Sequence, residues 1–224
     1  MKNGVMDVTG IILRVSQIGE RDRRVTVLTS EHGKLSFFAR GAARPGSPFM
    51  GVTRPFLYGA FSLFQGRDSY SLEAAQIKNY FEELGRDVET TCYAGYFLEL
   101  SDYYNRELAP ASRSLELLYR SFLALLKPAI PKRLTRRIFE LRSMVIDGAY
   151  DPEPPRRDAS CCRYTWHYIC TAPMEKLYTF SVSHEILTEL EQNLNESLRR
   201  YVDRELHSLE ILRMMTESEE HISG

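Results

Sequence analysis

Hydrophobic and polar residues alternate with a period of two through the first eighty residues of the chain. Ile11, Leu13 and Val15 share one parity, and further along the chain Phe61 and Leu63 do the same. A period of two is typical of β-strands that bury one face. The pattern predicts five strands, at residues 8–18, through 25–27, through 35–39, at 56–65 and at 70–77.

The second and third predicted strands flank the turn sequence EHGK at residues 31–34, which indicates a β-hairpin. The other connections are rich in glycine and proline. Five short strands joined in this way are typical of a small closed barrel, of which the OB-fold is the commonest version that binds nucleic acid. An SH3-like barrel gives a similar pattern of strands, so the pattern leaves both open.

From Tyr80 onward the hydrophobic period changes to 3.6, as in amphipathic helices. Helices are predicted to begin near Asp87, at 110–112 and at Pro131, and the third to end at Gly148. Further helices are expected over 161–171 and 183–215, with a break near 193–196. The predicted class is α+β: a five-stranded OB-fold barrel at residues 1–80, then an all-helical domain at residues 81–224 that contains a proline-rich connector at 151–159.

The formal net charge of −1 argues against a general polyanion binder, but the charge is unevenly distributed. Residues 1–80 hold 11 Lys+Arg and 6 Asp+Glu, so the first part is basic and the remainder acidic. The opening MKNGVMDVTG lacks the apolar core of a signal peptide, and no run reaches membrane-spanning length. Four cysteines suggest no disulfide framework. We expect a cytoplasmic protein that does not enter a membrane.

Basic residues gather in the predicted barrel beyond what a hairpin needs. Arginine matches phosphate geometry and stacks on bases, so an arginine-rich sheet with exposed aromatic rings suggests a nucleic-acid surface. Charges on exposed strands also deter aggregation, which is the alternative interpretation. The candidate DNA-binding residues are Arg14, Arg21, Arg23, Arg24, Lys34, Phe38, Arg40, Arg44, Arg54 and Arg67.

A second basic cluster consists of Lys132, Arg133, Arg136 and Arg137. Helical spacing places Arg133, Arg136 and Arg137 on one edge, beside an apolar face. A basic rim of this kind would suit an acidic peptide with an aromatic tip from a partner protein. Ordinary helix-surface charge explains the pattern equally well.

The sequence gives little support to an enzymatic function. The five histidines match no metal-ligand spacing, and no phosphate-binding or nucleophile motif is present. Cys161, Cys162, His167 and Cys170 could supply four zinc ligands. Their spacing is poor for one ion, however, and cysteines buried on a helix are the favoured interpretation. We expect no catalytic residues, no metal and no cofactor.

The order GIILRVSQIGERDRRVTVLTSEHGKLSFFARGAAR (10–44), then RPFLYGAFSLFQGRDSYSLEAAQI (54–77), resembles the N-terminal OB-fold of the bacterial RecO recombination mediators. FELRSMVIDGAYDPE (139–153) and EKLYTFSVSHEILTEL (175–190) are similar to the helical part of that family. Many members carry a CxxC…CxxC zinc knuckle after the counterpart of residues 148–152. Here the proline-rich connector stands in its place, so the resemblance implies a member that has lost the knuckle.

The resemblance implies a non-enzymatic DNA-repair protein that binds single- and double-stranded DNA and anneals complementary strands. It also implies partners: RecR and the acidic tail of single-stranded DNA-binding protein (SSB), with RecF and RecA as further partners. The basic barrel residues match the family's DNA-binding positions, and the cluster at 132–137 becomes the expected site for the acidic tail. Reversing the charge of Arg21, Arg23 and Arg24 should abolish DNA binding with little loss of stability. An RNA-binding OB-fold protein and a protein-interaction adaptor remain as alternatives.

Overall fold

The computed structural model describes residues 4–156 and 161–222, and for residues 216–222 it describes the backbone only. The chain divides into two compact units. One consists of the residues up to Glu83 together with Leu98–Leu115, and the other of Leu84–Phe97 together with the chain from Glu116 onward.

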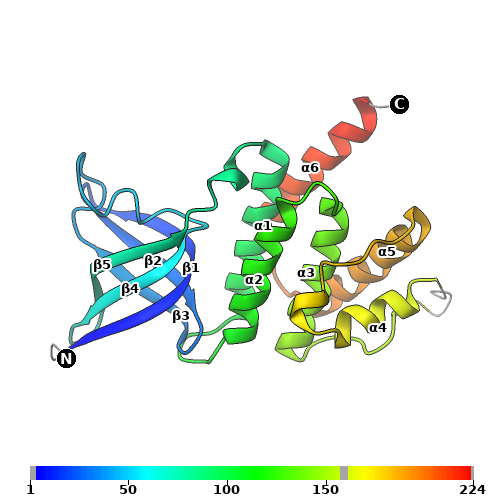
Figure 1. The fold of residues 1–224 in the computed structure, drawn as a ribbon, viewed down its shortest axis with the longest axis horizontal. Helices are drawn as coiled ribbons and strands as arrows, with labels where there is room; N and C mark the ends of the chain where they lie inside the picture. The colour runs from blue at the N-terminus through cyan, green and yellow to red at the C-terminus, as the bar shows by residue number, and fades with distance from the viewer. Residues whose placement is uncertain (1–3, 157–160, 223–224) are drawn as a thin grey trace. The chain divides into compact units, whose positions relative to one another are not determined.

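Five strands form a closed barrel in the first unit (Figure 1). Around the barrel the order is β1-β2-β3-β5-β4, with β3 and β5 parallel and the other neighbours antiparallel. This is the Greek-key barrel of an OB-fold, so the prediction of that fold is confirmed and the SH3-like alternative falls away. The strands are β1 (Val5–Ile18), β2 (Asp22–Thr29), β3 (Gly33–Ala39), β4 (Tyr58–Gln65) and β5 (Tyr70–Asn79).

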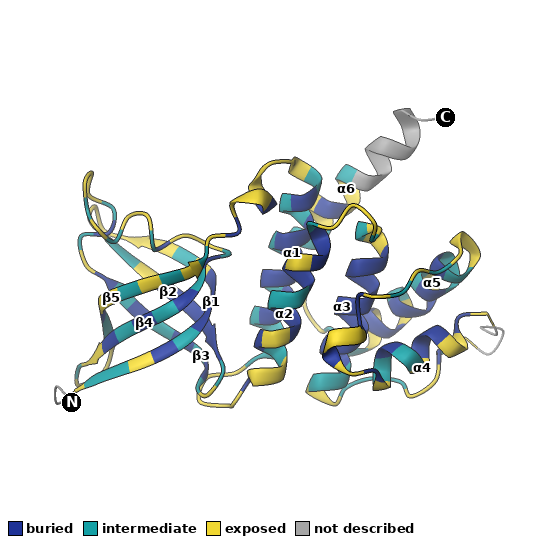
Figure 2. Cartoon of the chain, in the orientation of Figure 1, coloured by how far each residue is buried: buried dark blue, intermediate teal, exposed yellow. Residues whose placement is uncertain are grey.

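Alternation along the strands produces the barrel core, and in β3 every second residue is buried (Figure 2). Val25 lies opposite Phe37, and both side chains belong to the core. In β1 the core contains Ile12 and, partly buried, Val15, rather than Ile11. The register shifts between Ile12 and Arg14, so the uninterrupted alternation expected from Ile11 to Val15 is wrong.

Helices form the rest of the chain (Figure 1). One of them, α3, begins and ends as predicted, since Pro131 directly precedes it and Gly148, with φ of +86°, ends it. The helical elements are the 3₁₀ turn η1 (Glu82–Gly85), α1 (Val88–Tyr104), α2 (Ser112–Leu125), α3 (Lys132–Asp147), α4 (Arg163–Thr171), the 3₁₀ turn η2 (Met174–Lys176), α5 (His184–Tyr201) and α6 (His207–Ile222).

The predicted helix break near residues 193–196 is wrong, because α5 continues through them. Asn193 is fully buried, and its side-chain amide donates to the carbonyl of Glu189 one turn earlier, so the polar residue is satisfied inside the helix. The helix is instead interrupted at residues 202–206. Cys161 and Cys162 precede α4, so the prediction that they lie within the helix is also wrong.

The proline-rich connector is described as far as Arg156, and residues 157–160 lie outside the described residues. Asp151 holds its start in place: its carbonyl accepts from the Trp166 indole, and its carboxylate accepts from Ser197, Arg200 and Tyr201. Within the described part of the chain, no helix is long and apolar enough to cross a membrane.

Candidate nucleic-acid interface

The outer face of β1, β2 and β3 carries two arginines and one aromatic ring. Arg14 lies opposite Thr26, and Arg24 lies opposite Phe38. Since Val25 and Phe37, the next residues in the register, point into the core, Arg24 and Phe38 point outward. Arg14 and Arg24 are exposed, and Phe38 is half-buried. A positively charged face with an accessible ring is what single-stranded nucleic acid requires.

The loops around this face add further arginines. Arg21 lies in the β1–β2 turn, Arg67 in the β4–β5 turn, and Arg40 and Arg44 in the connection that follows β3. The β1–β2 and β4–β5 loops and the face of β2 and β3 are the parts that OB-folds use for oligonucleotides. Six of the candidate arginines are exposed, and in the described part of the chain their side chains make neither a hydrogen bond nor an ion pair, so their guanidinium groups can meet phosphates: Arg14, Arg21, Arg24, Arg40, Arg44 and Arg67.

Arg54 lies in the same connection but is already engaged. Its Nε donates to the carbonyl of Gly51 at 3.3 Å, and its guanidinium lies 3.9 Å from the Glu82 carboxylate. Both side chains are more than half exposed, so this pair contributes little to stability. Arg54 can therefore exchange Glu82 for another anion.

Two of the candidate residues, Arg23 and Lys34, make hydrogen bonds within the protein. The Nη1 atom of Arg23 donates to the carbonyls of Met50 and Thr53 and to the Thr53 hydroxyl, at 3.1, 3.0 and 3.0 Å. Lys34 Nζ donates to the backbone carbonyl of Asp102 at 2.6 Å and to its carboxylate at 3.0 Å. The contacts of Arg23 argue against the expectation that its charge can be reversed with little loss of stability.

A groove of about 350 Å³ lies against the outer face of β3. Its lining includes Arg24 and Phe38 from the sheet, Asp68 from the β4–β5 turn, and Glu107 with Leu108 from the segment after α1.

That segment is fixed to the hairpin by backbone bonds. The Lys34 amide donates to the Arg106 carbonyl at 3.0 Å, and the Leu108 amide donates to the His32 carbonyl at 2.9 Å. At Gly33 a Cβ would lie 2.3 Å from the carbonyl oxygens of both Arg106 and Ala109, so this close approach requires glycine. Sequence analysis missed Asp68, Glu107 and Leu108, because nothing local to residue 107 indicates a contact with residues 32–34.

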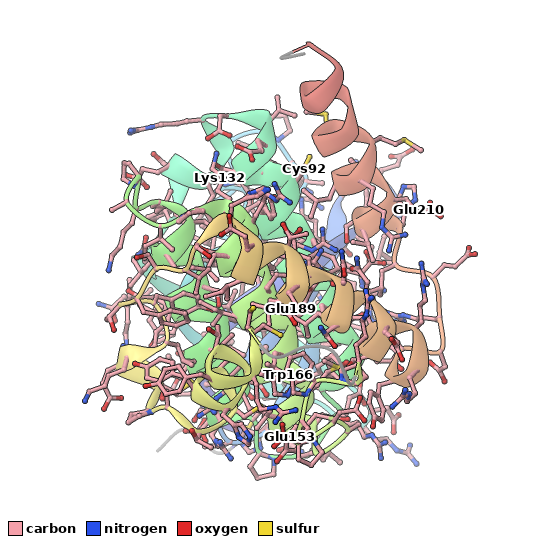
Figure 3. All side chains as sticks on the ribbon, turned by 90° about the vertical axis from the view of Figure 1, so that its right-hand side faces the viewer. Cys92, Lys132, Glu153, Trp166, Glu189 and Glu210 are labelled. Carbon is pink, nitrogen blue, oxygen red and sulfur yellow. The ribbon has the colours of Figure 1, made fainter. Side chains whose placement is uncertain are left out.

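The second basic cluster, at residues 132–137, lies in the helical unit and is extensively paired. Lys132, labelled in Figure 3, contacts Glu89 at 2.5 Å and Asp87 at 3.4 Å. Arg133 forms a bidentate pair with Glu191, at 3.1 and 2.7 Å. These two basic side chains remain partly exposed, so an acidic peptide could compete for them.

Arg136 and Arg137 are buried, at 7% and 5% exposure, rather than forming an open rim. Both donate to the fully buried carboxylate of Glu140 at 2.8 Å, and the Tyr96 hydroxyl donates to the same carboxylate at 2.8 Å. Burial alone would raise the pKa of Glu140, but the charges of Arg136 and Arg137 outweigh it and lower that pKa. Docking of an acidic tail at this cluster stays a prediction.

The cysteines and His167 are dispersed. Cys161 is exposed, whereas Cys162 is buried and its amide donates to the carboxylate of Glu189, labelled with Trp166 and Glu153 in Figure 3. His167 contacts Glu153 at 2.7 Å. Burial raises the pKa of the Cys162 and Cys170 thiols to about 12. Among the described side chains, at residues 4–156 and 161–215, no three His, Cys, Asp or Glu residues come together as a metal site would require.

The fold and the outer face together define an OB-fold protein with a basic, aromatic-bearing sheet surface, joined to a helical unit. The family model described as "Recombination protein O N terminal" matches residues 1–81.

Curated relatives extend the similarity into the helical part, and each of the following is named DNA repair protein RecO. The Shouchella clausii protein is 33% identical over 153 residues, which are 68% of this chain and 58% of the relative. The Acetivibrio thermocellus protein is 24% identical over 243 residues, 94% and 97% of the two chains. The Syntrophus aciditrophicus protein is 32% identical over 178 residues, 78% and 64%. The chain belongs to the RecO family, although the first and third of these alignments span less than two thirds of the relative.

Proposed function

We propose that this chain is a non-enzymatic DNA-repair mediator that binds single- and double-stranded DNA on the outer face of its barrel and anneals complementary strands. The observation that carries the proposal is the set of six exposed arginines on the barrel face and the loops around it, whose side chains have no partners among the described residues. Guanidinium groups that neutralise phosphates release counterions and lower the repulsion between two strands. Annealing needs this reduction of repulsion and no covalent step.

The proposal extends to partners. Membership of the RecO family supports a role in which the chain, with RecR, assists the loading of RecA on DNA coated by single-stranded DNA-binding protein, with RecF as a further partner. The acidic tail of SSB would dock on the helical unit at Lys132 and Arg133, where it would displace Glu89 and Glu191 from the two basic side chains. Buried Arg136 and Arg137 would support that docking only indirectly.

The test is the fluorescence anisotropy of a labelled single-stranded oligonucleotide, titrated with the protein at several salt concentrations. Wild type should bind with a steep negative salt slope, about 0.7 per neutralised phosphate on single strands. The double variant Arg21→Glu/Arg24→Glu should bind far more weakly, with a slope smaller in magnitude by about 1.4. Both arginines are exposed and without partners among the described residues, so the variant should fold normally.

The matched control is Arg113→Glu/Arg199→Glu, which makes the same change of charge at exposed helix positions. Its affinity and slope should remain close to wild type. Unchanged affinity in the folded Arg21/Arg24 variant would contradict the assignment of the face. Tighter binding of an RNA oligonucleotide of the same sequence would favour the RNA-binding alternative, and no binding at low salt would favour the adaptor.

A further inference from the structure

Phe38 contributes an aromatic ring to the wall of the groove beside β3. It is half-buried, and within the described residues it stacks on no aromatic side chain. Arg24 lies directly opposite it across the β2–β3 ladder. The groove's volume of about 350 Å³ is within the range of small-ligand sites, roughly 300–1,000 Å³. The groove therefore combines a free π-face with a cation at its edge.

The same groove also contains two carboxylates, Asp68 and Glu107, and both residues are exposed. A carboxylate repels a phosphate, so the sugar–phosphate backbone is disfavoured inside the groove. It is a good acceptor for the exocyclic amino group of a base, as in the pairing of Asp or Glu with the N4 amino group of cytosine. The groove is therefore suited to a base, whereas the exposed arginines around it are suited to phosphates.

A base that enters this groove must be unpaired. Its ring would have to leave the stack to lie on Phe38, and its polar edge, which a Watson–Crick partner occupies in a duplex, would have to face Asp68 or Glu107. We propose that the groove holds one unpaired base of a single-stranded nucleic acid, stacked on Phe38, and that the carboxylates favour a base with an exocyclic amino group over thymine. The proposal rests on the function proposed above, and it specifies that the groove binds single-stranded rather than duplex nucleic acid.

The first experiment compares single-stranded and duplex DNA in the anisotropy assay. Phe38→Ala should weaken binding of a 15-nucleotide single strand at least about fivefold, the lower limit for removing one stacking side chain. Duplex affinity should change less than twofold, and the salt slope should stay at the wild-type value because no phosphate contact is lost. Phe38→Leu should show the same selective loss, although it keeps most of the apolar volume. Phe38→Tyr keeps an aromatic ring and should bind as tightly as wild type.

The control is Phe64→Ala, which removes a more exposed aromatic ring from β4, outside the groove. It should leave the ratio of single-strand to duplex affinity unchanged. Equal losses on both forms of DNA for Phe38→Leu, or no loss on either, would overturn the stacking role. Thermal unfolding of each variant separates such losses from misfolding.

The second experiment compares oligo-dC with oligo-dT, both single-stranded and of equal length. Wild type should bind oligo-dC more tightly, and the ratio should fall towards one in Asp68→Asn/Glu107→Gln. Equal wild-type affinity for the two oligonucleotides would overturn the role of the carboxylates. If wild type binds no DNA at any salt concentration, the proposed function fails as well, whereas salt-dependent binding without these discriminations refutes the groove alone.

Discussion

Neighbouring arginines of β2 should respond very differently to truncation. Arg23→Ala removes the three contacts that Nη1 makes with Met50 and Thr53, and these contacts fix the long connection between β3 and β4. Arg24→Ala removes an exposed side chain that has no hydrogen bond or ion pair among the described residues. The two variants lose the same charge one residue apart, so they form a matched pair.

The structure sets the size of the difference. A hydrogen bond to a charged group contributes about 1.5–3 kcal/mol, and a single Nη1 has two N–H bonds to share among three acceptors. Because the contacts are only partly buried, we expect Arg23→Ala to cost about 2 kcal/mol of local stability. Arg24→Ala, as an ordinary surface substitution, should cost no more than about 0.5 kcal/mol.

Amide hydrogen exchange in the β3–β4 connection measures this difference directly. Ala43, Ser47, Met50 and Phe56 have backbone N–H groups bonded to carbonyls within or beside the connection. A loss of about 2 kcal/mol should accelerate their exchange about 30-fold in Arg23→Ala, since each 1.4 kcal/mol is a factor of ten. Arg24→Ala should exchange nearly as wild type does. Equal exchange rates in the two variants would show that Arg23 does not fix the β3–β4 connection.

Three further predictions follow from the helical unit. Glu140→Gln removes the counter-charge of buried Arg136 and leaves buried Arg137 only the more distant carboxylate of Glu191, at 3.7 Å, so it should lower the free energy of unfolding, measured with urea, by about 3–5 kcal/mol; a loss below about 1 kcal/mol would contradict the network. Burial raises the pKa of Tyr93 to about 12 from 10.0, so the stability linked to it is complete below pH 10 and lost as the pH rises towards 12. Urea midpoints at pH 9 and pH 11 test this, and equal midpoints would exclude it. Metal analysis of the purified protein should find substoichiometric zinc, whereas one tightly held equivalent would show that the zinc site has been retained.

Local patterns predicted the barrel well, because strand periodicity and turn chemistry depend on neighbouring residues. The alternation at residues 35–39 reappears as the buried and less buried positions of β3. The limits of α3 followed from Pro131 and Gly148 for the same reason. Where one extra residue interrupts the ladder, as between Ile12 and Arg14, the hydrophobic pattern does not indicate it.

Predictions that depended on what covers a residue were less successful. Helical spacing placed Arg136 and Arg137 on a shared edge, but it could not say that Tyr96, 44 residues from Glu140, would close over the carboxylate between them. The break predicted near residues 193–196 failed because Asn193 has a backbone acceptor inside the helix. Exposure depends on neighbours that are distant in sequence.

The sequence by itself determined that the first eighty residues form a small barrel and that arginines are concentrated on it, because both are properties of short segments. It presented Arg21, Arg23 and Arg24 as equivalent charges. The tertiary structure left Arg21 and Arg24 exposed and directed Arg23 into the β3–β4 connection. It also placed Glu107 in the groove beside Phe38. Which partner a side chain finds depends on which segments the folded backbone brings together, and a one-dimensional pattern does not contain that information.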